Sequence, residues 1–78
     1  MTASPRIALE QWRALLAVVD KGGYAQAAAS LHKSQSAVTY AVQKMESLLG
    51  VKIFEVIGRK ARLTATGQVL YRRAKSAW

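Results

Sequence analysis

Hydrophobic residues recur at helical spacing near the start of the chain. The pattern predicts an amphipathic helix over residues 9–21, because apolar side chains three and four positions apart share one face. Two glycines, at positions 22 and 23, end this helix, since glycine adopts the left-handed cap conformation without strain. The face expected to enter the core contains Leu9, Trp12, Leu15, Leu16, Val18 and Val19.

Two further helices are predicted with only three residues between them. Residues 24–31 (YAQAAASL) are rich in alanine, which favours helix and lets a second helix cross closely. Residues 35–49 have apolar positions at helical spacing, with Ser34 placed as the N-cap and Gly50 as the terminator. Because residues 32–34 can form only a tight turn, the pattern indicates a helix-turn-helix.

The helix predicted over residues 35–49 has two distinct faces. Its apolar side is expected to pack on the core through Val38, Ala41, Val42, Met45, Leu48 and Leu49. Ser36, Thr39, Tyr40 and Gln43 lie at positions i, i+3, i+4 and i+7, so they share the opposite face. The flanking polar residues are Gln35 and Lys44.

After Gly50 the pattern changes from helical to extended. Residues 51–57 are β-branched and aromatic, residues 58–60 suit a hairpin tip, and residues 61–63 suit a short return strand. Thr64 is placed to cap a last helix that runs to Trp78, with Leu70, Tyr71 and Ala74 on the same side. The predicted fold is mainly α: a winged helix-turn-helix with a three-helix core and a β-hairpin wing, followed by a C-terminal helix.

Charge adds a class of partner to this picture. The 78 residues contain twelve lysines and arginines against four aspartates and glutamates, a formal net charge of +8. Such an excess favours nucleic acid or an anionic membrane surface. The longest apolar run, residues 14–19, falls far short of the ~20 residues that span a bilayer, and no secretory signal is visible at the N-terminus. We therefore expect a cytoplasmic protein with no membrane partner.

The inventory of reactive side chains argues against catalysis and cofactors. There is no cysteine and only one histidine, His32, with no cluster of ligands around it. Nothing in the sequence pairs an acid with a base or a nucleophile with its activator. We expect no enzyme activity, no metal and no cofactor.

The helix-turn-helix pattern gives the polar face a specific role. In this motif the second helix enters the DNA major groove, and its N-terminal residues contact base edges. Gln35 can pair with adenine, while Ser36 and Thr39 can bond to several bases. Tyr40 can bond a phosphate or pack on a thymine methyl group. The remaining candidates are basic residues for phosphates or the flanking minor groove: Lys33 in the turn, and Arg59, Lys60 and Arg62 in the hairpin.

Two other interpretations fit part of the pattern. A cationic module that binds any nucleic acid by charge explains the net charge, but leaves the polar face of residues 35–43 unexplained. A protein-interaction module would use the apolar side of the last helix, and is compatible with DNA binding. Discrimination between DNA sites separates the first alternative from a sequence-specific reader.

From residue 9 to residue 78 the chain resembles the N-terminal domain of LysR-type transcriptional regulators, which are bacterial proteins. The resemblance rests on residues 24–39 (YAQAAASLHKSQSAVT), with LLGV at 48–51, IF at 53–54, GR at 58–59 and LTATG at 63–67. It implies a winged helix-turn-helix over residues 1–64 and a linker helix over residues 65–78. The helix at 35–49 would lie in the major groove and the wing at 51–63 in the adjacent minor groove.

The same resemblance implies partners and sites. Family members bind interrupted palindromic promoter sites as homodimers, and sense a small-molecule effector through a C-terminal domain that this chain does not contain. The expected DNA-binding residues are Lys33, Ser34, Gln35, Ser36, Thr39, Tyr40, Gln43, Lys44, Arg59, Lys60 and Arg62. The expected dimer surface contains Val69, Leu70, Ala74 and Trp78. Departures from the family pattern occur at Lys33, Ser36, Tyr40 and Val56.

Overall fold

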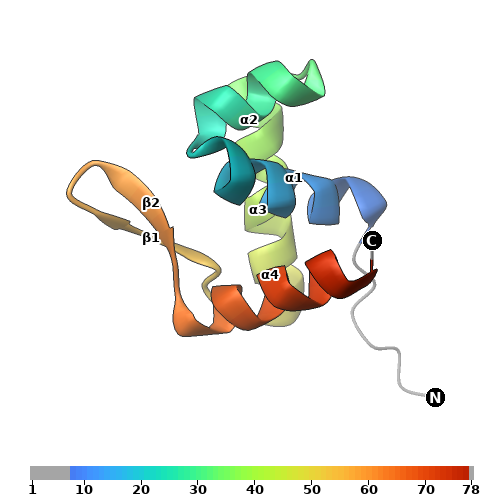
Figure 1. Ribbon diagram of the computed structural model, residues 1–78, viewed down its shortest axis with the longest axis vertical. Helices are drawn as coiled ribbons and strands as arrows, with labels where there is room; N and C mark the ends of the chain where they lie inside the picture. Colours follow the sequence, from blue (N-terminus) through green and yellow to red (C-terminus); the bar gives the residue numbers. More distant parts are fainter. Residues whose placement is uncertain (1–7, 78) are drawn as a thin grey trace.

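The computed structural model describes residues 8–77 and contains four helices and one hairpin within them. The elements follow the order α1 (Leu9–Lys21), α2 (Tyr24–Leu31), α3 (Gln35–Leu49), β1 (Phe54–Ile57), β2 (Lys60–Leu63) and α4 (Ala65–Ala77). In Figure 1, α2 lies at the top of the molecule, α1 in the middle and α4 at the bottom. α3 runs along the long axis behind α1, and the hairpin projects to the left. The predicted winged helix-turn-helix is confirmed.

The first three helices begin and end at the predicted residues. Ser34 caps α3, because its hydroxyl oxygen accepts a hydrogen bond of 3.1 Å from the Ala37 amide. Gly22 and Gly50 adopt the left-handed conformation that ends α1 and α3. At the end of α2 this conformation falls on His32, with φ of +57°. The only histidine therefore forms the turn of the helix-turn-helix.

The first strand of the hairpin is shorter than predicted, and the second begins one residue earlier. β1 begins at Phe54, because the Val51 amide still bonds to the Glu46 carbonyl at the end of α3. β2 begins at Lys60, and the antiparallel register pairs Phe54 with Leu63 and Ile57 with Lys60. The expected tip of residues 58–60 therefore narrows to two residues, of which Gly58 has φ of +69°.

The core face of α1 differs from the expected one. Its buried residues are Ala14, Leu15, Ala17 and Val18, whereas Leu9 is 52% exposed. Trp12, Leu16 and Val19, which were expected at the centre of the stripe, are only half-buried. The reason is that the small alanines let α2 and α3 pack closely against α1, so the larger residues are displaced to the rim.

The root of the wing joins three elements through the backbone of Ile53. The Glu46 carboxylate at the end of α3 accepts hydrogen bonds from the amides of Ile53, at 2.8 Å, and Phe54, at 3.3 Å. The Ile53 carbonyl accepts one of 2.9 Å from the Thr64 amide. Thr64 also caps α4, since its hydroxyl accepts from the Gly67 amide at 3.0 Å. One peptide segment thereby connects α3, the wing and α4.

Gly67 allows this close approach. A Cβ atom at this position would overlap the Ile53 carbonyl oxygen and lie 2.9 Å from Leu63 Cδ2. The clash is with backbone, which cannot move aside as the end of a flexible side chain can. Glycine is therefore required here for packing and not for its backbone dihedral angles.

We predict that Gly67→Ala lowers the free energy of unfolding by about 1–3 kcal/mol, the usual cost of overpacking. A glycine-to-alanine substitution inside a helix, without such a clash, would raise the free energy of unfolding by roughly 0.5–1 kcal/mol. Urea unfolding followed by circular dichroism measures the change. The matched control is Ser76→Ala on the exposed side of α4, which should leave stability unchanged or raise it. Stabilisation by Gly67→Ala would contradict the close approach.

Candidate nucleic-acid interface

The polar side chains of α3 gather on one uncovered surface. Five of the predicted DNA-binding residues line a single shallow depression: Gln35, Ser36, Thr39, Tyr40 and Gln43. All are exposed except Thr39, which is half-buried. Within residues 8–77 no other element covers this surface, because the opposite side of α3 is the one that packs on the core through Val38, Val42 and Met45. We call these five residues the α3 polar face.

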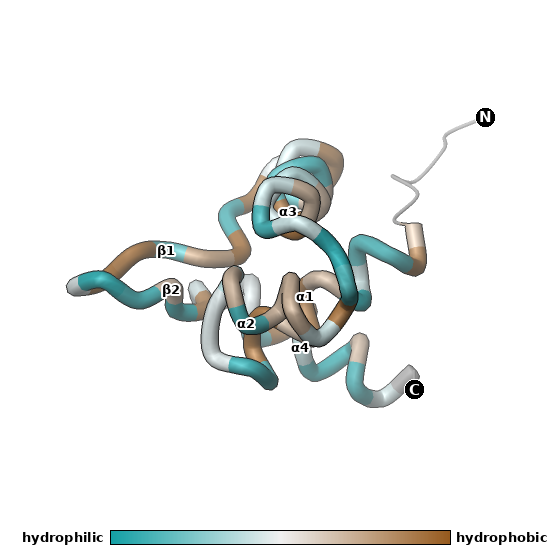
Figure 2. Tube along the Cα trace, turned by 90° about the horizontal axis from the view of Figure 1, so that it is seen from above, coloured by the Kyte–Doolittle hydropathy of each residue, from teal (hydrophilic) through white to brown (hydrophobic). Residues whose placement is uncertain are grey.

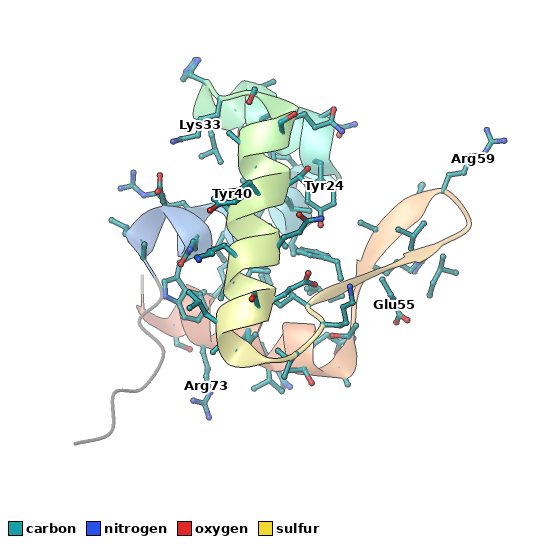
Figure 3. The ribbon with its side chains drawn as sticks, turned by 180° about the vertical axis from the view of Figure 1, so that it is seen from behind. Tyr24, Lys33, Tyr40, Glu55, Arg59 and Arg73 are labelled. Carbon is teal, nitrogen blue, oxygen red and sulfur yellow. The ribbon has the colours of Figure 1, made fainter. Side chains whose placement is uncertain are left out.

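Tyr40 is the most prominent member of the α3 polar face. Its side chain is 65% exposed, which is unusual for a large aromatic residue. Figure 3 shows α3 in front, with Tyr40 on the side of α3 away from the wing. The ring and the hydroxyl are both available to a ligand.

Lys33 lies beside Tyr40 and forms an ion pair with another residue of the same chain. Its Nζ atom lies 3.5 Å from Glu10 Oε2 in the first turn of α1, and both side chains are largely exposed. Lys33, Glu10 and Tyr40 line one pocket between α1 and α3. An exposed ion pair of this kind contributes little stability, so a stronger anion can displace Glu10 from Lys33. Lys44 is exposed farther along α3.

The wing carries its basic residues away from the helical body. Arg59 stands at the tip, where Figure 3 shows its side chain pointing outward, and Lys60 and Arg62 are exposed on β2. β1 contributes exposed apolar surface instead, with Val56 76% and Ile57 54% exposed. Figure 2 shows this contrast between the hydrophobic β1 and the mostly hydrophilic tip and β2. The positive charge of the wing therefore lies on the tip and the return strand.

Two residues outside the predicted set fix the wing relative to α3. Glu46 holds the amides of Ile53 and Phe54, as described above. Tyr24, at the start of α2, packs edge-on against Phe54 with ring centres 5.9 Å apart. Burial raises the pKa of the Tyr24 hydroxyl above its usual value, and the nearby negative charge of Glu46 raises it further. Tyr24 is therefore a neutral packing residue.

The position of Glu46 in the sequence could have indicated its structural role. It lies in the last turn of α3, where the helix dipole disfavours a negative charge, and no basic residue lies in that turn. An acid placed there needs hydrogen-bond donors from outside the helix. The contact of Tyr24 could not be predicted from local sequence, because its partner Phe54 is 30 positions away in a separate element.

The residues predicted for dimerisation do not form one exposed surface within the chain. Ala74 is 4% exposed and Leu70 packs partly against the core, whereas Val69 is 42% exposed. Trp78 lies outside the described residues. The exposed side of α4 carries Val69, Arg72, Arg73 and Ser76, which line one open depression. Figure 3 shows Arg73 pointing away from the helical body.

Residues 8–77 contain no group of three or more histidine, cysteine, aspartate or glutamate side chains able to hold a metal ion. No helix within that range is both long enough and apolar enough to cross a membrane.

A three-helix core, a two-stranded wing and an uncovered polar face on the second helix of the turn define a winged helix-turn-helix protein. The sequence model for the lysR family of bacterial regulatory helix-turn-helix proteins matches residues 9–68. The chain belongs to the LysR family of bacterial regulatory helix-turn-helix proteins. The family resemblance found in the sequence is thereby confirmed.

Individual relatives agree with this assignment. A probable RuBisCO transcriptional regulator of Synechocystis sp. is 44% identical over 62 residues, covering 80% of this chain and 18% of that protein. Another, from Cyanidioschyzon merolae, is 41% identical over 66 residues, covering 85% of this chain and 22% of that protein. The chain therefore corresponds to a small part of the length of both relatives.

Solved structures share the fold. The CbnR DNA-binding domain in complex with DNA is similar with a TM-score of 0.84 and 34% identity, over 90% of this chain and 80% of that one. Oxidised OxyR of Corynebacterium glutamicum has a TM-score of 0.87 and 30% identity, over 97% of this chain and 23% of that one.

We predict that Glu46→Ala loosens the wing and lowers the free energy of unfolding by about 1–2 kcal/mol, because two half-buried amides lose their acceptor. Hydrogen exchange of the Ile53 and Phe54 amides should speed up more than that of amides in α1. The control is Glu55→Ala, which removes the same charge from an exposed position of β1. Equal effects of the two variants would show that charge, and not the hydrogen bonds, stabilises the wing.

Proposed function

We propose that this chain is the sequence-specific DNA-binding domain of a LysR-type transcriptional regulator. The observation that carries the proposal is the α3 polar face, whose five hydrogen-bonding side chains line one depression between Gln35 and Gln43 on the second helix of the motif. Short polar side chains at this point let the helix approach base edges closely. The similar CbnR DNA-binding domain is solved in complex with DNA, which supports DNA as the partner.

The α3 polar face lies in the major groove in this proposal. Gln35 reads adenine through its amide, which can donate and accept at the same base. Ser36 and Thr39 bond to base edges, and Tyr40 packs on a thymine methyl group or bonds a phosphate. Gln43 extends the contact along the helix. The hydroxyl of Ser34 already accepts from Ala37, so it donates to phosphate.

Basic residues provide affinity and position α3 on the duplex. Lys33 and Lys44 flank the α3 polar face and bind phosphates on its two sides. Arg59, Lys60 and Arg62 reach the adjacent minor groove or its phosphates from the wing. These contacts carry little sequence information. Through them the net charge of +8 provides affinity for the phosphates of any DNA.

The DNA-binding unit is residues 1–64, and residues 65–78, of which the structure describes Ala65–Ala77 as α4, serve as a linker that pairs with a second copy. A homodimer of this kind binds two half-sites, hence an interrupted palindrome near a promoter. The exposed side of α4 supports this assignment through Val69, while Leu70 and Ala74 contribute by holding α4 on its own chain. We assign the sensing of a small-molecule effector to a region outside this sequence, and the site of action to the cytoplasm. Catalysis has no part in the proposal.

The proposal is tested by selecting sites from random duplexes and comparing variants on the selected site and on unrelated DNA. Gln35→Ala or Thr39→Ala should weaken specific binding by ~1–3 kcal/mol and leave non-specific binding nearly unchanged. Arg59→Ala is the contrasting variant. It should weaken binding to both DNAs alike and reduce the salt slope by about 0.9, the effect of one lost phosphate contact. Equal losses on both DNAs for the α3 variants would contradict base reading by the α3 polar face.

A separate test addresses the dimer. Val69→Asp places a charge on the exposed side of α4, so we expect the sedimentation coefficient to fall from that of a dimer to that of a monomer. Gln68→Glu is the control, since it adds the same charge to a different side of the same helix. Leu70→Asp is unsuitable because Leu70 also packs on the core. Unchanged sedimentation of Val69→Asp would remove this side of α4 from the interface.

A further inference from the structure

Asp20 connects the end of α1 to the second half of α4. Its Oδ1 atom accepts a hydrogen bond of 2.5 Å from the Tyr71 hydroxyl, and its Oδ2 atom lies 3.3 Å from Lys75 Nζ. Tyr71 and Lys75 are one turn apart on α4, and the ammonium group lies 5.7 Å from the centre of the Tyr71 ring. Both carboxylate oxygens are therefore engaged by the same helix.

The three groups favour the same arrangement electrostatically. The hydrogen bond from Tyr71, with the positive charge of Lys75, lowers the pKa of Asp20 below its usual value. Asp20 in turn raises the pKa of Tyr71 and of Lys75. The positive charge of the neighbouring Lys21 also lowers the pKa of Asp20, whereas the C-terminal end of α1 disfavours a negative charge there.

These contacts are exposed, so they add little to the overall stability of the fold. They matter because they hold the second half of α4, at Tyr71 and Lys75. The first turn of α4 is fixed at Gly67, which touches the Ile53 backbone, and the middle packs through Leu70. Beyond that point, within the described residues, the core contact is Ala74, which has only one methyl group to hold the helix. Among the described residues, the contacts with Asp20 add a second restraint, beside Ala74, against a tilt of this half.

We propose that Asp20, through Tyr71 and Lys75, sets the angle of α4 on the helix-turn-helix and thereby the spacing of the two half-sites that a dimer reads. This inference rests on the proposed function. Gly67 and Lys75 are eight residues apart, which is about 12 Å along a helix. A helix whose second half is held only by Leu70 and the single methyl group of Ala74 can tilt over that length about its fixed first turn. In a dimer joined through α4, such a tilt changes the distance between the two α3 polar faces.

Asp20→Ala and Tyr71→Phe test the inference. The first removes both contacts and favours the helix, and the second removes only the hydroxyl group. The probes are one duplex with a single selected half-site and a series with two half-sites whose separation changes by one base pair at a time. We expect the wild-type chain to prefer one separation by about tenfold or more, and both variants to spread their affinity over neighbouring separations within about threefold. Affinity for the single half-site should stay within about twofold of wild type.

Other results would contradict either the role of Asp20 or the proposed function. A wild-type separation profile in both variants, or a wild-type chain without a preferred separation, would refute the positioning role of Asp20. An equal loss on the single half-site would make Asp20 a general structural residue. Absence of sequence preference in the wild-type chain would instead refute the proposed function itself. Asp20→Glu, which retains the charge, should restore part of the separation preference.

Discussion

The peptide unit of Ile53 is held from both sides, and the geometry of the remaining elements depends on it. Its amide donates to Glu46 at the end of α3, and its carbonyl accepts from Thr64 at the start of α4. Gly67 lies so close to that carbonyl that no side chain fits between them. The wing therefore leaves α3 at a fixed point and α4 leaves the wing at another. Three elements that would otherwise meet at flexible loops behave as one body.

This rigidity matters because the two candidate DNA-contacting surfaces belong to different elements. The α3 polar face can select a sequence only if the basic residues of the wing hold the helix at a constant depth in the groove. Tyr24 and Phe54 add apolar packing to the hydrogen bonds at the wing root, so the hairpin is supported from α2 as well. Phosphate binding by Arg59, Lys60 and Arg62 thus constrains where Gln35 and Thr39 meet the bases.

Most of the secondary structure follows from local sequence, and most of the anchoring contacts do not. Glycine positions and helical periodicity gave the bounds of α1, α2 and α3, and Ser34 and Thr64 were identifiable as caps. The buried face of α1 was misplaced because close packing through alanine depends on which helices cross it. Tyr71 and Asp20 are 51 positions apart, so no local pattern relates them. The α3 polar face was found because all its members lie within three turns of one helix.

Nuclear magnetic resonance can show directly whether the α3 polar face and the wing contact DNA. The ¹⁵N-labelled chain would be titrated with a duplex that carries its selected site, and shifts of backbone and side-chain amides would be followed. We predict large shifts for residues 33–44 and 58–62, including the side-chain amides of Gln35 and Gln43. Shifts concentrated on the exposed side of α4, with the α3 polar face unperturbed, would contradict this prediction.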